Sequence, residues 1–263
     1  MTVIIPEIYR GPPRSGNGGY VSGIFAALLK RRPEEPVEVT LRSPVPLDHP
    51  MDVESDADEL RVYNEGTLVA GVRPGPATLD LNIPEPPDFD TALAAQPHSI
   101  SLQPREGGPM AGGRGFHPIC YCCGADHEDG LYVFASRIDD VQSAAAWQTK
   151  TMWADVDGNL PAPLLWTALD CPGQVAFAVE GIRTGLLGRI TANILRPAVA
   201  GEDFVVTAWR EAIEGKKHFA GTAIFDRQGE LIASARSIWI GRQNQGASEQ
   251  QETAIDVRSR DVS

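Results

Sequence analysis

Apolar residues recur along the chain with two different periods, and the change of period separates expected helices from expected strands. Helical spacing predicts helices over residues 19–31 and 161–171. Alternating apolar and polar positions predict strands elsewhere. The expected strands are residues 37–43, 51–55, 59–63, 67–73, 130–138, 144–154, 187–195, 203–213, 217–225 and 230–240.

These elements fall into two segments, residues 1–75 and 116–241. Residues 76–115 between them are rich in Pro, Gly and Ala, with the runs IPEPPDFD and GGPMAGGRG, and predict a long connection with little regular structure. Residues 242–263 are polar and predict a disordered tail.

Two pairs of matching stretches indicate that the two halves of the chain share one sequence pattern. LRSPVPLDHPMDVE at residues 41–54 parallels ILRPAVAGEDFVVT at residues 194–207. EGTLVAGVR at residues 65–73 parallels QGELIASAR at residues 228–236, and four of these nine positions are identical. Since the two matches occur in the same order, we predict an internal duplication in which each half is a helix followed by antiparallel strands.

A long helix followed by such strands can bury itself against one face of their sheet, and two such units can pair edge to edge, which leaves fewer exposed edges. This arrangement resembles the hotdog fold in its tandem, double-hotdog form. The expected fold class is therefore α+β, with two tandem hotdog repeats, each a long helix on an antiparallel sheet, joined into one continuous sheet. The motifs CYCCG, DGL and WTALDCPG in the second half are also similar to members of the hotdog thioesterase superfamily. The first half matches that superfamily more weakly.

The resemblance implies where an active site would lie. In hotdog thioesterases a helix opening with His-Gly-Gly or Asn-Gly-Gly supplies glycine N–H groups that polarise the thioester carbonyl, and a carboxylate from a facing helix acts as nucleophile or base. Here Asn17, Gly18 and Gly19 open the first expected helix, which has no acid, whereas Asp170 ends the second, which lacks the glycines. Gln174 follows one helical turn later if that helix continues. The resemblance thus implies one asymmetric catalytic site and an inactive counterpart.

The chemistry that such a site would perform is hydrolysis of an acyl-CoA-type thioester. A carboxylate at the end of the apolar run LLWTALD should be partly desolvated, which raises its pKa. Alternatively, Asp170 caps a neighbouring N–H, and the protein binds an acyl-CoA or another apolar ligand without turnover. A hydratase or dehydratase is a further alternative, although no His closely follows Asp170 as such enzymes would require.

Charge and composition exclude some classes of binding partner. The net charge of −12 and the sequence pI of about 4.8 disfavour nucleic acid, whose phosphates such a protein repels. No apolar run is long enough to span a bilayer, and the N-terminus does not resemble a signal peptide. We therefore expect a cytoplasmic protein that acts on a small-molecule acyl thioester linked to coenzyme A, without membrane partners. The outer sheet edges would allow a homodimer.

The cysteines raise a separate question. The pattern His117-x2-Cys120-x2-Cys123-x3-His127 has zinc-like spacing, but four ligands within eleven residues would make a cramped site. Clustered cysteines also do not resemble a secreted disulfide framework. We expect reduced thiols here, with neither a metal nor a cofactor, and keep zinc binding as the alternative.

Overall fold

The computed structural model describes residues 1–104, 115 and 117–241, so the predicted tail lies outside the described residues. The strands are β1 (Thr2–Val3), β2 (Val37–Leu41), β3 (Met51–Asp56), β4 (Glu59–Asn64), β5 (Thr67–Pro74), β6 (Ser136–Arg137), β7 (Gln142–Gln148), β8 (Leu187–Ile194), β9 (Asp203–Glu214), β10 (Lys217–Asp226) and β11 (Leu231–Ile240). The helices are α1 (Gly18–Leu28), α2 (Phe89–Ala95), α3 (Ala162–Ala168) and α4 (Cys171–Ala178), with short 3-10 turns η1 (Glu7–Tyr9), η2 (Gln96–His98) and η3 (Thr151–Trp153).

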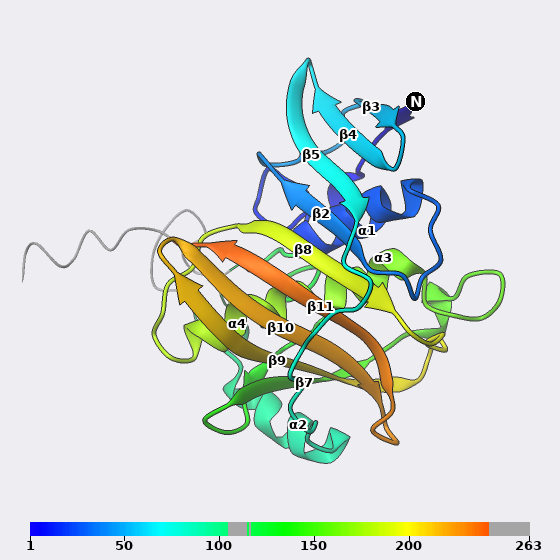
Figure 1. Cartoon of the computed structure of the whole chain (residues 1–263). Helices are drawn as coiled ribbons and strands as arrows, with labels where there is room; N and C mark the ends of the chain where they lie inside the picture. The colour runs from blue at the N-terminus through cyan, green and yellow to red at the C-terminus, as the bar shows by residue number, and fades with distance from the viewer. Residues whose placement is uncertain (105–114, 116, 242–263) are drawn as a thin grey trace, which may run out of the picture.

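All of these strands form one antiparallel sheet in the order β1-β3-β4-β5-β2-β8-β11-β10-β9-β7-β6 (Figure 1). Strands β1 to β5 come from the first half of the chain and β6 to β11 from the second. The halves join where β2 pairs with β8, from the Val37–Ala192 pair to the Thr40–Arg189 pair. The expected α+β fold with one continuous sheet is therefore confirmed.

Corresponding strand pairs in the two halves have corresponding registers. In the first half Leu41 lies opposite Ala70, and in the second half Ile194 lies opposite Ala233. The two sequence matches independently align Leu41 with Ile194 and Ala70 with Ala233. The hairpin turns before β5 and β11 also correspond, because Gly66 and Gly229 have φ angles of +77° and +81°, a region that favours glycine.

Helices α1, α3 and α4 pack on one face of the sheet and on one another, whereas α2 packs on the opposite face. Helix α1 contacts β2, β5 and β8, whereas α4 contacts β7, β9 and β10. Helices α1 and α3 cross closely, and a Cβ added to Gly23 of α1 would lie 2.7 Å from Pro163 Cα of α3. The large side chains buried in this layer, including Phe25, Leu165 and Phe177, supply the apolar area that stabilises the packing.

The second half differs from the sequence prediction at three places. The strand expected over residues 144–154 is too long, because β7 ends at Gln148 and residues 151–153 form η3. The helix expected over residues 161–171 is interrupted, because α3 ends before Asp170 and α4 begins at Cys171. Pro172 does not end the helix but occupies the first turn of α4, where its missing N–H costs no hydrogen bond. The strand expected over residues 130–138 is also wrong in extent, since only Ser136–Arg137 is a strand.

The predicted linker contains regular structure. Residues 89–98 form α2 and η2, and α2 packs against β7 and β9, so the expectation of little structure is wrong there. The segment before α2 crosses the face of the sheet opposite α4 (Figure 1). Leu81 and Ile83 pack there against the cluster that contains Trp209 and Phe225. This segment thereby covers apolar surface of β9 and β10.

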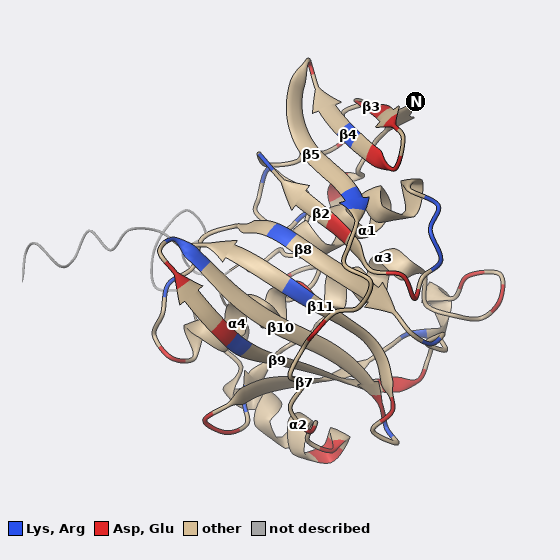
Figure 2. Ribbon diagram, in the orientation of Figure 1, with Lys and Arg blue, Asp and Glu red and all other residues tan. Residues whose placement is uncertain are grey.

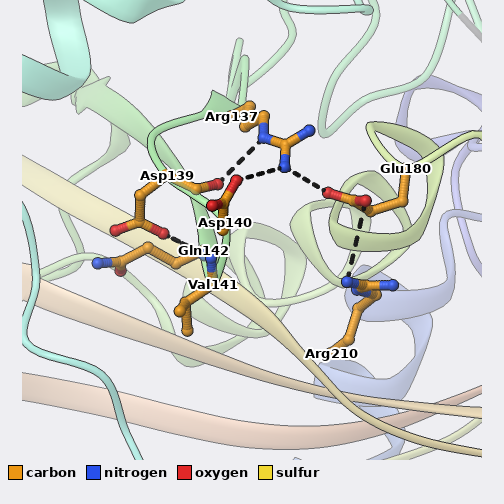
Figure 3. Close-up of polar contacts among 7 residues, drawn as sticks. All are labelled: Arg137, Asp139, Asp140, Val141, Gln142, Glu180 and Arg210. Atoms are coloured by element: carbon orange, nitrogen blue, oxygen red, sulfur yellow. Dashed lines mark hydrogen bonds and ion pairs between the residues drawn. The ribbon is translucent and has the colours of Figure 1, made fainter.

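Charged side chains pair across this outer face and at its rim. Blue and red positions alternate across β5, β2 and β8 in Figure 2, where Glu38 binds Arg73 at 2.8 Å and Arg189 at 3.5 Å. At the rim, Arg137 lies between Asp140 and Glu180, at 2.9 and 3.0 Å (Figure 3). Such exposed pairs contribute little stability individually. None of the helices in the described residues has the length and apolar character that crossing a membrane requires.

Candidate active site

The glycine-rich stretch forms a capped helix start. The Asn17 Oδ1 accepts a hydrogen bond from the Tyr20 N–H at 2.9 Å and so caps α1. Gly18 and Gly19 are the first two residues of the helix, where backbone N–H groups have no intrahelical acceptor and the helix dipole is positive. This end of α1 is therefore suited to bind a carboxylate or a polarised carbonyl.

A carboxylate from the second half occupies this position. Asp170 stands at the break between α3 and α4, and its Oδ2 accepts the Gly19 N–H at 2.8 Å. A Cβ added to Gly19 would lie 2.6 Å from the Asp170 Cβ and 2.8 Å from the Thr167 Cα. Only glycine at position 19 lets the two helices approach closely enough for this bond.

The Asp170 carboxyl is almost completely enclosed, with 2% of the residue exposed. Burial raises its pKa to about 7 because the charged form loses solvation, while the Gly19 N–H and the Asn17 side chain act in the opposite direction. Its Oδ1 is buried and has no hydrogen-bond partner among the described residues. One carboxylate oxygen is therefore without a hydrogen bond within the described part of the chain, and the pKa of the carboxyl is suited to proton transfer near neutral pH.

A pocket of about 200 Å³ brings most of the predicted site residues together. Asn17, Gly18, Asp170 and Gln174 line it. The Gln174 Nε2 donates to the Thr184 Oγ1 and to the Gly185 carbonyl oxygen, both at 3.0 Å, which holds its side chain in place.

The two glycines differ in what their N–H groups do. The Gly19 N–H, expected to face a substrate carbonyl, donates to Asp170 instead, and Gly19 does not line the pocket. The Gly18 N–H has no acceptor among the described residues, and Gly18 does line the pocket. Of the two glycines, Gly18 is therefore the one whose N–H can donate a hydrogen bond to a ligand in the pocket.

The comparisons with known proteins concern the fold. No family model matches the chain, and no curated protein matches it. A candidate thioesterase of Novosphingobium aromaticivorans is similar over 92% of this chain and 94% of its own, with a TM-score of 0.57 and 12% identity. The tesB protein of Mycobacterium avium subs paratuberculosis is similar over 92% of each chain, with a TM-score of 0.56 and 12% identity. A candidate thioesterase II of Thermobifida fusca covers 93% of each chain, with a TM-score of 0.55 and 14% identity.

The chain has the double-hotdog fold. The expected resemblance to thioesterase-superfamily structures is thereby confirmed at the level of the fold over most of the chain.

The sequence did not connect Cys171 with the other cysteines. In this double hotdog the Sγ atoms of Cys120, Cys123 and Cys171 all lie within 4.8 Å of one another. Cys171 follows Asp170 directly in the chain, and Cys120 and Cys171 line the same pocket. Cys171 belongs to the quoted motif WTALDCPG, but its sequence separation from Cys120 hides the contact.

The histidines of the zinc-like pattern separate in the structure. His117 lines the pocket. The His127 Nε2 lies 2.7 Å from the Ile8 carbonyl oxygen, and its Nδ1 accepts the Asp129 N–H at 3.0 Å. His127 is therefore engaged on both ring nitrogens and is not in the thiol cluster.

Proposed function

We propose that this protein hydrolyses an acyl-CoA-type thioester at one asymmetric site between its two halves. The observation that carries the proposal is the buried Asp170 carboxylate, held by the Gly19 N–H at the start of α1, with Gly18 lining the same pocket. The shared fold with thioesterase structures supports it as an analogy only.

In this proposal, Gly18 stabilises the thioester carbonyl during the reaction. The thioester oxygen accepts a hydrogen bond from the Gly18 N–H, and the positive end of the α1 dipole stabilises the negative charge that develops on that oxygen. Loss of one such donor typically raises the barrier by about 3–4 kcal/mol.

In the same proposal, Asp170 activates the water molecule that attacks the carbonyl carbon. The free Oδ1 of Asp170 takes a proton from a water molecule as the water oxygen bonds to the carbonyl carbon. The tetrahedral intermediate then collapses, the carbon–sulfur bond breaks, and the leaving thiolate takes the proton from Asp170. Gln174, fixed by Thr184 and Gly185, orients the substrate or the water.

We further propose that the site arose by internal duplication. The matched registers of β2–β5 and β8–β11 support two related halves. The first half then supplies the donor glycines and the second half supplies the acid, so each chain carries one site.

The second candidate function is binding of an acyl-CoA or apolar ligand without turnover. One observation favours it: the Gly19 N–H already donates to the Asp170 carboxylate. Of the two glycines, only Gly18 therefore has an N–H without an acceptor among the described residues. The two functions differ in whether thiol is released repeatedly.

Free-thiol release from a panel of short, long and aromatic acyl-CoA esters tests the proposal. Wild type is compared with Asp170→Asn and, as a matched control, with Asp157→Asn at an exposed loop position. We expect turnover that falls about 10²–10⁴-fold in Asp170→Asn and stays unchanged in Asp157→Asn. Undiminished turnover in Asp170→Asn would contradict the assigned base, whereas ligand binding without turnover of any ester would favour the second candidate.

A further inference from the structure

Three cysteines lie together near Asp170, and two of them, Cys120 and Cys171, line the pocket. Cys120, Cys123 and Cys171 have exposed fractions of 1%, 7% and 6%, and all three are free of disulfide bonds. Their Sγ atoms lie within 4.8 Å of one another, although Cys171 comes from a different element of the chain. Three buried thiols that converge in this way form a ligand set, which apolar packing alone does not require.

The spacing of the sulfurs fits a tetrahedral metal ion. Sulfur ligands at about 2.3 Å from zinc lie about 3.8 Å apart at the corners of a tetrahedron. The Cys120 and Cys171 Sγ atoms are 3.7 Å apart. Thiolate ligands also favour soft or borderline ions such as zinc over calcium or magnesium.

The loop that carries two of these thiols has a tight turn. The Gly124 N–H donates to the Cys120 carbonyl at 2.8 Å, and the Cys120 N–H donates to the His117 carbonyl at 2.9 Å. A Cβ on Gly124 would lie 2.5 Å from the Pro118 carbonyl oxygen, so glycine is required there. This Cys-x-x-Cys-Gly turn brings Cys120 and Cys123 to one side of the loop.

A hydrogen-bond donor lies beside two of the three cysteines. The Asn17 Nδ2 lies 3.6 Å from the Cys120 Sγ and 3.8 Å from the Cys171 Sγ and donates toward both. Donors of this kind orient metal ligands and stabilise their charge.

We propose that Cys120, Cys123 and Cys171 bind one zinc ion at the edge of the pocket. Binding of Zn²⁺ and one water by three thiols yields a zinc tris-thiolate with a bound water and releases three protons. Cys120 and Cys171 line the pocket, so the ion has a path of entry and the water has a place to bind. The ion would link the 120–123 loop to the break between α3 and α4, beside Asp170.

Cys122 supplies the matched control. It belongs to the same segment and is completely buried, but its sulfur is not a member of the cluster. A serine at position 122 therefore perturbs the same loop without removing a proposed ligand.

The test is the metal content of the full-length chain, prepared under reducing conditions with zinc present and then dialysed. We expect about one zinc per chain in wild type and in Cys122→Ser, and loss of the ion in Cys120→Ser, Cys123→Ser and Cys171→Ser. Zinc retained by Cys171→Ser, or wild type without bound zinc, would overturn the proposal.

A second measurement uses wild type alone, so that misfolding of a variant cannot decide the outcome. Chelator-treated protein is titrated with Co²⁺, and we expect the visible absorption and the sulfur-to-metal charge-transfer band of tetrahedral cobalt thiolate. Absence of these bands, or a Cys120–Cys171 disulfide found by mass spectrometry in freshly purified protein, would refute the zinc site. Neither measurement depends on thioesterase activity, so the two proposals can fail separately.

Discussion

Helix α1, which precedes β2, and helix α3, which comes before β8, differ in the chemistry of their starts. Helix α1 has the Asn17 cap, two glycines and the Asp170 carboxylate against its first turn. Helix α3 begins after Pro161, which provides no side-chain cap, and its first turn has no acid. Helix α1 itself ends in Ala26, Ala27 and Leu28, where the sequence has no counterpart of Asp170.

In the proposed function, this difference is the reason for one site per chain instead of two. The close approach of helices requires small residues on one side only, and a carboxylate can be buried only where an N–H group meets it. In the proposed function, the first half supplies the glycines and the second half supplies the carboxylate.

The largest effect is expected for Gly19→Ala. The new Cβ would collide with the Asp170 Cβ and the Thr167 Cα, which forces α1 away from α3 and breaks the bond to Asp170. We expect a loss of about 3 kcal/mol or more in unfolding free energy, measured by denaturant titration.

The matched control for that variant is Gly71→Ala in β5. An added Cβ at Gly71 would meet nothing within 4 Å, so unfolding free energy should be unchanged or slightly raised. Equal destabilisation by both variants would contradict the importance assigned to the Gly19 contact.

An intermediate effect is expected in the pH dependence of stability. The folded state raises the Asp170 pKa from 3.8 to about 7, so between these values the folded chain holds a proton that the unfolded chain lacks. Stability should therefore fall as pH rises, by roughly 2 kcal/mol between about pH 5 and 7, relative to Asp170→Asn.

This comparison uses chelator-treated protein, so that no bound cation changes the carboxyl pKa. Wild type and Asp170→Asn are unfolded with denaturant at several pH values. A difference between them that stays constant from pH 4 to 8 would show that burial does not perturb this carboxyl.

The smallest effect is expected for helix caps. Asn17→Ala removes the cap of α1, and Asp88→Ala removes the cap that accepts the Thr91 N–H at 2.6 Å in α2. Each should cost about 1 kcal/mol of stability, measured by thermal or denaturant unfolding. Only Asn17→Ala should also slow thiol release, because Asn17 lines the pocket and Asp88 does not. Equal slowing by both would remove the functional role of Asn17.

Much of this arrangement could be predicted from sequence because it depends on local patterns. The long second-half strands, the start of α1 and the registers of β5 and β11 follow from periodicity and from the two matched stretches. The break between α3 and α4 at Asp170 could not be predicted from sequence, because a proline such as Pro172 is compatible both with the end of one helix and with the first turn of another.

Long-range packing explains the remaining differences. The contact of Cys171 with Cys120 depends on how α4 meets the 120–123 loop, which no spacing within one motif reveals. The Gly19 N–H was expected to face a substrate, but the crossing of α1 and α3 brings Asp170 to it first. Helix α2 is short and Asp88 caps it, yet the surrounding prolines suggested a linker.

The most direct test of one site per chain is the binding stoichiometry of Asp170→Asn with the best acyl-CoA substrate, measured by isothermal titration calorimetry. This variant should bind the thioester without consuming it. The account predicts one ligand per chain, competed by the same ester's non-hydrolysable thioether. Two ligands per chain would show that the start of α3 is a second working site and would contradict the account.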